Sequence, residues 1–211
     1  MSDEPNGMRA PVQARSHEST ERILDGALSV LDRAGLSGLT MAAVANEAAM
    51  SIGAIYHRFA DRRHLLIAVQ DRFLSRLERD WLNTSAPIWA TEDRDEQLHR
   101  LVAAFTETFA THRNAFKAFM VTGNDDPGLR ARGNESSGRF AAYFAAQLTE
   151  RFGCPPDAAE AAYRLLLADA VLSIMFSPAE VTGASAPAAR PAHLVAAIRA
   201  VLTAAGSTGT N

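Results

Sequence analysis

The chain has 211 residues, 47% of them hydrophobic, which is enough to bury the core of one large domain or of two smaller ones. A formal net charge of −3 excludes a basic field over the whole molecule, so any contact with nucleic acid must be local. Cys154 is the single cysteine, so no intramolecular disulfide can form. The longest apolar stretch, residues 161–176, contains Arg164 and Asp169 and is too short to span a membrane. These features lead us to expect a cytoplasmic protein.

Apolar residues recur at helical spacing along almost the whole chain, and β-branched alternation is missing, so the expected fold class is all-α. Residues 1–17 are expected to form a flexible arm. The first helix is predicted from about Thr20 to Ala34. Ser19 would cap its N-terminus, and Gly35 would end it in a left-handed conformation.

Two short helices are predicted next. Thr40 would cap the second helix, residues 41–48, and Ser51 would cap the third, residues 52–58. A tight turn separates them.

A long helix is predicted from Arg62 to Asn83, with Asp61 as its N-cap. Residues 84–93 and 177–191 are expected to be loops, the second because it is rich in Pro, Ala, Gly and Ser. The remaining predicted segments are helices over residues 94–112, 113–122, 127–152, 155–176 and 191–204, and a frayed tail over 206–211.

The predicted order is one helix, two short helices joined by a tight turn, and a long helix. This arrangement is typical of a helix-turn-helix, in which the second short helix enters the major groove of DNA. Residues 52–58 would therefore be the recognition helix, and residues 18–64 the DNA-binding domain. The candidate DNA-binding residues are Thr40, Ser51, Ile52, Gly53, Ala54, Tyr56, His57, Arg62 and Arg63.

The chemistry of these residues suggests their roles. Thr40 and Ser51 stand at helix N-termini, where free backbone N–H groups favour a phosphate. Ile52 and Ala54 can contact thymine methyl groups, and Gly53 lets the backbone approach DNA closely.

The other candidates are polar or charged. Tyr56 and His57 can each donate a hydrogen bond to a phosphate or a base, and Arg62 and Arg63 can neutralise phosphate charge. The alternative is that residues 40–66 form only a packed three-helix corner with a solvated polar edge.

The stretch LTMAAVANEAAMSIGAIYHRFADRRHLLIAV resembles the DNA-binding signature of TetR-family transcriptional regulators. With the first helix, the resemblance covers about residues 19–70. Ala49 departs from the pattern, because the family usually has glycine there. If that position needs a positive φ, alanine is strained by about 1 kcal/mol. The matching positions are Thr40, Val44, Ala45, Ser51, Gly53, Ile55, Tyr56, Phe59, Leu65 and Leu66.

The resemblance implies that the rest of the chain, residues 65–205, is a divergent helical domain that binds a small molecule and dimerises. The aromatic density of this region suits a largely apolar cavity, although a single aromatic residue is more often part of a core. The candidate pocket residues are Phe73, Trp81, Phe105, Phe109, Phe116, Phe119, Met120, Phe140, Tyr143 and Phe144.

The last two predicted helices, about residues 156–177 and 191–204, are dense in Ala and Leu. Two copies of this pair could form a four-helix interface, so a homodimer is expected from the resemblance. The alternative is that the two helices only cap the ligand-binding domain.

No paired carboxylates, catalytic triad or Gly-rich phosphate loop stands out, so neither an enzyme nor a cofactor is expected. The six histidines show no close metal-ligand spacing. The predicted function is a ligand-responsive regulator that binds a near-palindromic DNA operator, a repressor released by a small, largely apolar molecule. A transcriptional activator and a ligand-independent architectural DNA binder of the same fold are the alternatives.

Overall fold

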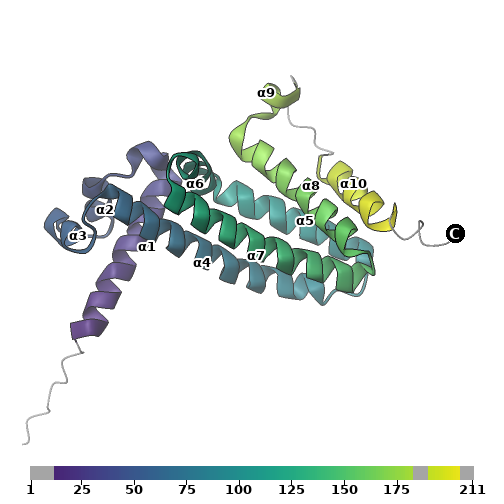
Figure 1. Cartoon of the computed structure of the whole chain (residues 1–211), viewed down its shortest axis with the longest axis horizontal. Coiled ribbons are helices and arrows are strands. Elements are labelled where there is room, and N and C mark those ends of the chain that lie inside the picture. Colours follow the sequence, from purple (N-terminus) through teal and green to yellow (C-terminus); the bar gives the residue numbers. More distant parts are fainter. Residues whose placement is uncertain (1–11, 183–189, 205–211) are drawn as a thin grey trace, which may run out of the picture. The chain divides into compact units, whose positions relative to one another are not determined.

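The computed structural model describes residues 12–182 and 190–204, and residues 1–11 of the predicted arm and the predicted tail 206–211 lie outside this range. Every regular element within the range is a helix, which confirms the all-α class (Figure 1). The chain forms two compact units, Met1–Val69 and Gln70–Asn211. Among the described helices, none combines the length and the apolar character needed to cross a bilayer.

The N-terminal unit contains three helices and the start of a fourth: α1 (Val12–Gly38), α2 (Met41–Glu47), α3 (Ile52–Arg58) and α4 (Arg62–Trp89). α1 begins well before the predicted start at Thr20, since the residues ahead of Thr20 include good helix formers such as Gln, Ala and Glu. Gly35 interrupts the helical backbone of α1 with φ 64° and ψ −169°, a positive φ as predicted.

The core of the N-terminal unit takes apolar side chains from all four helices, and its most buried members include Ile23, Leu31, Val44, Ile55 and Leu65, each 0% exposed. This close packing depends on a glycine in α1. A Cβ atom at Gly26 would lie 3.2 Å from the backbone nitrogen of Ala48, so a larger residue would push α1 away from the end of α2.

Helix α4 is longer than predicted. It continues past Asn83 to Trp89, although Pro87 lies inside it and lacks the N–H of a regular helical hydrogen bond. Ile88 and Trp89 are 4% and 5% exposed. The burial of these two large side chains outweighs the helix-breaking tendency of proline, so the predicted loop over residues 84–93 is wrong for most of its length.

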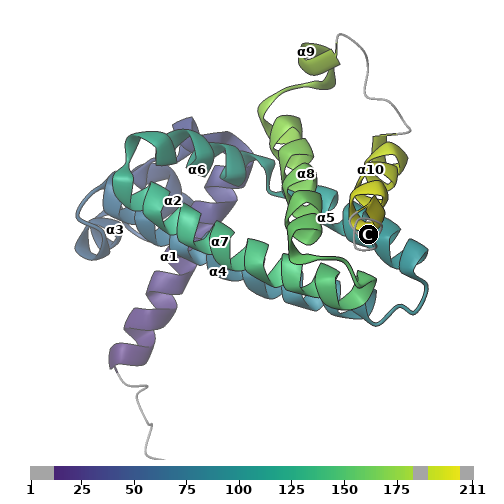
Figure 2. The ribbon, with the colours of Figure 1, turned by 45° about the vertical axis from the view of Figure 1, so that its right-hand side comes forward.

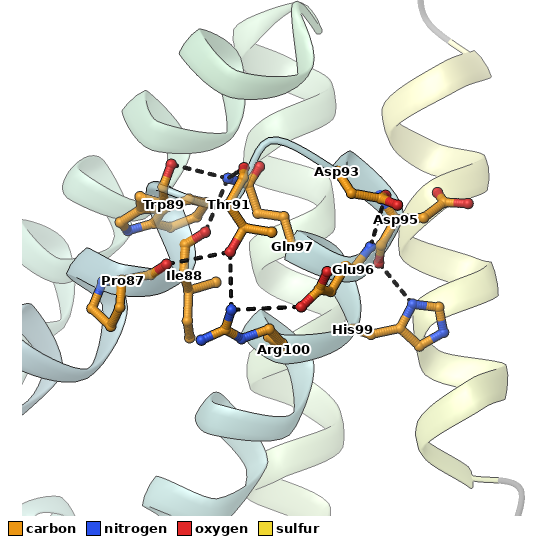
Figure 3. A network of polar contacts seen from close by, with 10 residues as sticks. All are labelled: Pro87, Ile88, Trp89, Thr91, Asp93, Asp95, Glu96, Gln97, His99 and Arg100. Carbon is orange, nitrogen blue, oxygen red and sulfur yellow. Dashed lines mark hydrogen bonds and ion pairs between the residues drawn. The ribbon is translucent and has the colours of Figure 1, made fainter.

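A buried glutamine stabilises this end of α4 (Figure 3). The Gln97 side-chain amide donates to the carbonyl oxygens of Ile88, Trp89 and Thr91, at 3.1, 3.2 and 3.2 Å. Asp93 caps the next helix by accepting the backbone N–H groups of the two residues after Arg94, at 2.8 and 3.1 Å. Side chains thus satisfy the free backbone groups at both helix ends, which a short connection would otherwise leave unpaired.

The C-terminal unit adds α5 (Arg94–Thr111), α6 (Arg113–Asp125), α7 (Pro127–Phe152), α8 (Pro156–Met175), α9 (Pro178–Thr182) and α10 (Arg190–Ala204). α8 packs against α5, α7 and α10, and Figure 2 shows it between α7 and α10. The short α9 lies in a segment predicted as loop. The other five helices begin and end within about three residues of their predicted limits, where Pro127 and Pro156 provide clear helix starts.

Candidate functional site

The two short helices are capped as predicted. The Thr40 hydroxyl accepts a hydrogen bond from the backbone N–H of Ala43 at 3.1 Å. The Ser51 hydroxyl accepts one from Ala54, also at 3.1 Å. Each cap fixes where its helix begins and so fixes which side chains of the helix point outward. The phosphate contacts expected at these N-termini stay a prediction.

The turn between α2 and α3 places an alanine in the left-handed region. Ala49 has a φ of 52°, so the condition under which alanine is strained at this position is met. The backbone N–H of Met50 donates to the carbonyl oxygen of Ala45 at 2.9 Å, and this bond closes the end of α2. The tight closure forces the backbone conformation, so the alanine side chain is strained there.

Helix α3 has a buried face and an exposed face. Ile55 is 0% exposed and Phe59, just after the helix, is 8% exposed. On the other face, Ile52 and Tyr56 are 47% and 54% exposed. The candidate residues on or next to this outward face are Ser51, Ile52, Gly53, Tyr56 and His57, all exposed, together with the half-buried Ala54.

Gly53 has no packing partner that requires a glycine. A Cβ atom there would meet only the Ser51 hydroxyl oxygen, at 3.9 Å, which is an ordinary contact. Its helical backbone also has no positive φ. A glycine in a helix costs about 0.5–1 kcal/mol relative to alanine, so the N-terminal unit gains nothing internally from this residue.

Arginine side chains hold the helices of the N-terminal unit together. Arg62 donates from Nε to the carbonyl oxygen of Leu39 at 2.8 Å and from Nη2 to that of Leu36 at 2.7 Å. Arg22 donates to the carbonyl oxygen of Ala48 at 3.0 Å. These hydrogen bonds satisfy backbone carbonyl oxygens at or near helix ends, where the helix itself offers no N–H donor. Arg62, Arg63 and Thr40 are exposed, but two nitrogen atoms of Arg62 are engaged within the chain, and its phosphate contact stays a prediction.

Two further side-chain contacts connect α1 to α2 and α3. Arg58 donates from Nε to the Thr20 hydroxyl at 3.1 Å. Glu47 accepts hydrogen bonds from Arg33 at 2.8 Å and from Ser29 at 2.7 Å. The hydrogen bond from Arg33, followed by that from Ser29, lowers the pKa of the Glu47 carboxyl below its ordinary value. Helix α3 is therefore held on its inner side, and its outer side is left uncovered.

The C-terminal unit contains a cavity of about 400 Å³. It is lined by residues of α4 to α8, and many of them are aromatic. The lining includes these candidate pocket residues: Phe73, Trp81, Phe105, Phe109, Phe116, Phe119, Met120 and Phe140.

Two candidate pocket residues do not line the cavity. Phe144 is 1% exposed and packs in the core, its ring centroid 6.2 Å from that of Trp89. The Tyr143 hydroxyl lies 3.5 Å from that of Ser85. Both are on α7, like Phe140. Phe144 lies one turn after Phe140 on the same helix face, and its ring packs behind the lining residues Trp81 and Phe105, with centroids 5.9 and 5.7 Å away.

Sequence reasoning missed most of the polar lining, including Gln70, Glu78, Ser136 and Tyr163. The spacing along α4 offered a signal, because its lining residues recur every three or four positions and so share one helix face. These residues are Gln70, Phe73, Leu74, Leu77, Glu78 and Trp81. Burial raises the pKa of the Tyr163 hydroxyl. In the described part of the chain no cluster of His, Cys, Asp and Glu could hold a metal ion.

Comparison with known proteins points to one family. Residues 23–69 match the model of the bacterial regulatory proteins of the tetR family. An uncharacterised HTH-type transcriptional regulator from the dhlA 5′ region of Xanthobacter autotrophicus is 38% identical over 100 residues, 46% of this chain and 45% of that protein. The HTH-type transcriptional regulator BetI of Burkholderia lata is 33% identical over 113 residues, 52% of this chain and 57% of that protein. The chain thus spans about half the length of these curated relatives.

Solved structures share the fold over nearly the whole chain. A protein from Mesorhizobium loti described as a TetR-family transcriptional regulator is 20% identical, with a TM-score of 0.71 over 90% of this chain and 98% of that chain. The multidrug binding protein EbrR, solved with imidazole, is also 20% identical, with a TM-score of 0.64 over 94% of this chain and 97% of that chain. The family match, the curated relatives and the geometry of α1 to α4 agree: residues 23–69 form a DNA-binding domain of the tetR-family type, and the chain is similar in sequence and fold to TetR-family transcriptional regulators.

Proposed function

We propose that this protein is a homodimeric repressor that binds a near-palindromic operator through α3 and is released by a small molecule in the cavity of its C-terminal unit. The observation that carries the DNA-binding part is the outward face of α3. This face carries two large exposed side chains, Ile52 and Tyr56. It also carries Gly53, which the packing of the chain itself does not require to be a glycine. The opposite face of the helix is packed against the rest of the unit. Such an outward face fits the edges of bases in a major groove.

The proposed dimer is supported by the exposed face of α8. Leu165, Leu172 and Phe176 are 42%, 46% and 46% exposed, and their spacing of seven and four residues puts them on one stripe. Ala161 and Ala168 lie on the same stripe and are also exposed. An exposed apolar stripe of this kind suits a second copy of the chain, because a two-fold axis would bring the same stripe against itself.

A neighbouring helix extends this surface. α10 packs beside α8 and exposes Ala196, Ala197 and Ala200, whose small side chains permit close approach of another helix. Changing Leu172 to Glu should shift the protein from dimer to monomer in sedimentation at micromolar concentration. Leu82→Glu is the matched control, because Leu82 is 51% exposed on α4 and should leave the dimer intact. A monomer in the unaltered protein would contradict the proposed dimer.

The proposed response to a ligand is supported by the cavity and by its place on α4. Residues 62–69 of α4 belong to the N-terminal unit, and residues from Gln70 to Trp81 line the cavity. A ligand that displaces the cavity segment of a continuous helix can alter the helix-turn-helix that the same helix supports. The fold neighbour EbrR was solved in complex with ethidium and with malachite green, so a cavity in this fold can hold an aromatic molecule.

The test of the proposed function is selection of bound sequences from a random DNA duplex pool, with the purified protein at a fixed salt concentration. We expect enrichment of a pseudo-palindrome whose half-sites lie about one helical turn apart or a multiple of it. Recovery of weak, unenriched binding would contradict sequence-specific regulation and favour the architectural binder. Transcription from a promoter that carries the selected site distinguishes a repressor from an activator.

A further inference from the structure

Arg62 is the first residue of α4, and its guanidinium group is directed towards the end of α1. Its Nε atom donates to the carbonyl oxygen of Leu39 at 2.8 Å, and its Nη2 atom donates to that of Leu36 at 2.7 Å. Two hydrogen bonds from one planar group fix both its place and its orientation. One edge of the guanidinium is therefore committed within the chain, whereas the sequence predicts a phosphate as its partner.

The two carbonyl groups lie where α1 ends. Gly35 interrupts the helical backbone, so the last turn of α1, which ends at Gly38, is short. Carbonyl groups in such a turn have few N–H donors within the helix, and a nearby cation is favoured by the helix dipole. The carbonyl oxygen of Leu36 also accepts the backbone N–H of Leu39 at 3.2 Å, and Arg62 adds a charge-assisted bond to it.

The segment that Arg62 holds leads directly into the two short helices. Leu39 is 0% exposed, and the next residue, Thr40, is the N-cap of α2. α2 packs against α1 and α3, and the closed turn after α2 leads to Ser51, the N-cap of α3. The hydrogen bonds of Arg62 therefore attach the beginning of the α2–α3 pair to the first turn of α4.

The N-terminus of α4 already has an anion beside it. The Oδ1 atom of Asp61 accepts the backbone N–H of His64 at 2.9 Å and lies 2.9 Å from Nδ1 of the same residue. Hydrogen bonds from the backbone and then from the ring of His64 lower the pKa of the Asp61 carboxyl, so it is ionised near neutral pH. A phosphate at this helix end would meet a negative charge at the place where free N–H groups would otherwise favour it.

We propose that Arg62 is a positioning residue of the DNA-binding domain and does not bind a phosphate. It holds the start of α2 on α4 and so sets how α3 meets the major groove. This inference rests on the proposed function, because it concerns the geometry of the surface that α3 presents to DNA. Contacts of this kind must be held within about 0.5 Å and about 10–20°, so loss of Arg62 weakens base recognition. Phosphate contacts made by other residues, and the non-specific binding that they support, are left in place.

Two substitutions of Arg62 separate positioning from phosphate binding. Arg62→Lys keeps the positive charge, and lysine binds phosphate, but it lacks the rigid planar fork that joins the two carbonyl oxygens. Arg62→Met removes the charge and keeps an aliphatic side chain. Arg76→Met is the matched control, because Arg76 is an exposed arginine of α4 outside the N-terminal unit, 3.5 Å from Asp80.

Fluorescence anisotropy gives the affinity of each full-length protein for the operator obtained by selection and for a scrambled duplex of the same composition. The measurements cover a range of salt concentrations, at a temperature where thermal unfolding shows every variant to be folded. We expect both Arg62 variants to bind the operator about tenfold more weakly, which is the effect of losing a charge-assisted hydrogen bond. Affinity for the scrambled duplex and the salt slope should stay unchanged, because no phosphate contact is lost. Arg76→Met should match the unaltered protein on both duplexes.

Amide hydrogen exchange of the DNA-free protein tests the attachment itself. The amides of α2 should exchange faster in both Arg62 variants than in Arg76→Met, because local opening of this helix becomes easier. Unchanged exchange in α2 would overturn the inference, whatever the protein does with DNA.

Three results on DNA would also overturn it. In the first, Arg62→Lys keeps full operator affinity while Arg62→Met lowers the salt slope by about 1 on both duplexes, so Arg62 binds a phosphate. In the second, both variants lose equal affinity for the two duplexes. In the third, operator affinity is unchanged in both variants, so the side chain has a structural role alone.

Failure of the proposed function gives a different result. The unaltered protein would then select no operator, while hydrogen exchange would still decide whether Arg62 holds α2. An operator selected by the unaltered protein, together with any of the three contrary results, would leave the DNA-binding function in place and remove the assignment of Arg62.

Discussion

The two units of the chain differ in where their candidate functional surface lies. In the N-terminal unit, the arginines Arg22 and Arg62 and the caps Thr40 and Ser51 hold the short helices from within, and Ile52 and Tyr56 of α3 are left exposed. In the C-terminal unit, helix ends are capped as well, for example by Asp93, but the aromatic side chains line a cavity inside the unit. The contrast is between a unit that presents a surface outward and a unit that encloses a space.

The largest expected effect tests the two faces of α3 with the same residue type. Ile55→Ala removes a side chain that is 0% exposed and should destabilise the N-terminal unit by about 3 kcal/mol. Ile52→Ala, the matched control, removes one that is 47% exposed and should change stability by less than about 0.5 kcal/mol. Urea unfolding gives the free energies, and hydrogen exchange of the α1 to α3 amides locates the loss. Similar costs for the two variants would show that α3 is not held as described.

Gly53→Ala should affect folding and DNA binding in opposite directions. The added methyl group has room inside the chain, so the N-terminal unit should gain about 0.5–1 kcal/mol in unfolding free energy. If the backbone of Gly53 lies against DNA, affinity for the selected operator should fall by about tenfold or more, or roughly 1.4 kcal/mol. Urea unfolding and fluorescence anisotropy measure the two quantities on one preparation. Unchanged operator affinity would remove Gly53 from the interface.

Ala49→Gly should stabilise the turn between α2 and α3. The positive φ of Ala49 strains an alanine but not a glycine, and part of that gain is offset by the greater freedom of glycine in the unfolded chain, so we expect a net gain of about 0.5–1 kcal/mol. Ala42→Gly, at an exposed position inside α2, should instead lose about 1 kcal/mol. Equal losses in urea unfolding of the two variants would mean that Ala49 is not strained.

The smallest effect concerns the Glu47 carboxyl. Its pKa is lowered in the folded chain, so its contribution to stability is present above the pKa of an unfolded glutamate and is lost as the pH falls through the folded pKa. Thermal unfolding of Glu47→Gln should therefore differ slightly from that of the unaltered protein at pH 7 and converge with it in acid. A difference that grows towards low pH would have the wrong sign for this contact.

Prediction from the sequence worked best where a local rule decides the structure. The start of α3 follows from Ser51 and was predictable from the sequence. The resemblance to the family, which usually has glycine at position 49, raised the possibility of a positive φ at Ala49, and the structure has one. The end of α4 was not predictable, because tertiary burial of Ile88 and Trp89 overrides the local effect of Pro87.

The cavity shows the same division. The density of aromatic residues predicts an apolar region, and most of the predicted pocket residues line the cavity. Gln70 and Glu78 lie at helical spacing on the face of α4 that carries Phe73, which is a weak signal in the sequence. It does not suffice, because polar residues of a long helix are usually on its surface, and only the hydrogen bonds to α7 show that this face is covered. The role of Arg62 was equally hidden, since its partners are backbone carbonyl groups more than twenty residues away.

The central claim is that the outward face of α3 reads base sequence, and selection of bound duplexes with Ile52→Ala beside the unaltered protein tests it most directly. We predict that both proteins select the same half-site spacing, and that the variant loses preference at one base step in each half-site, where the isoleucine contacts a thymine methyl group. An unchanged sequence preference, with or without a uniform loss of affinity, would contradict this assignment.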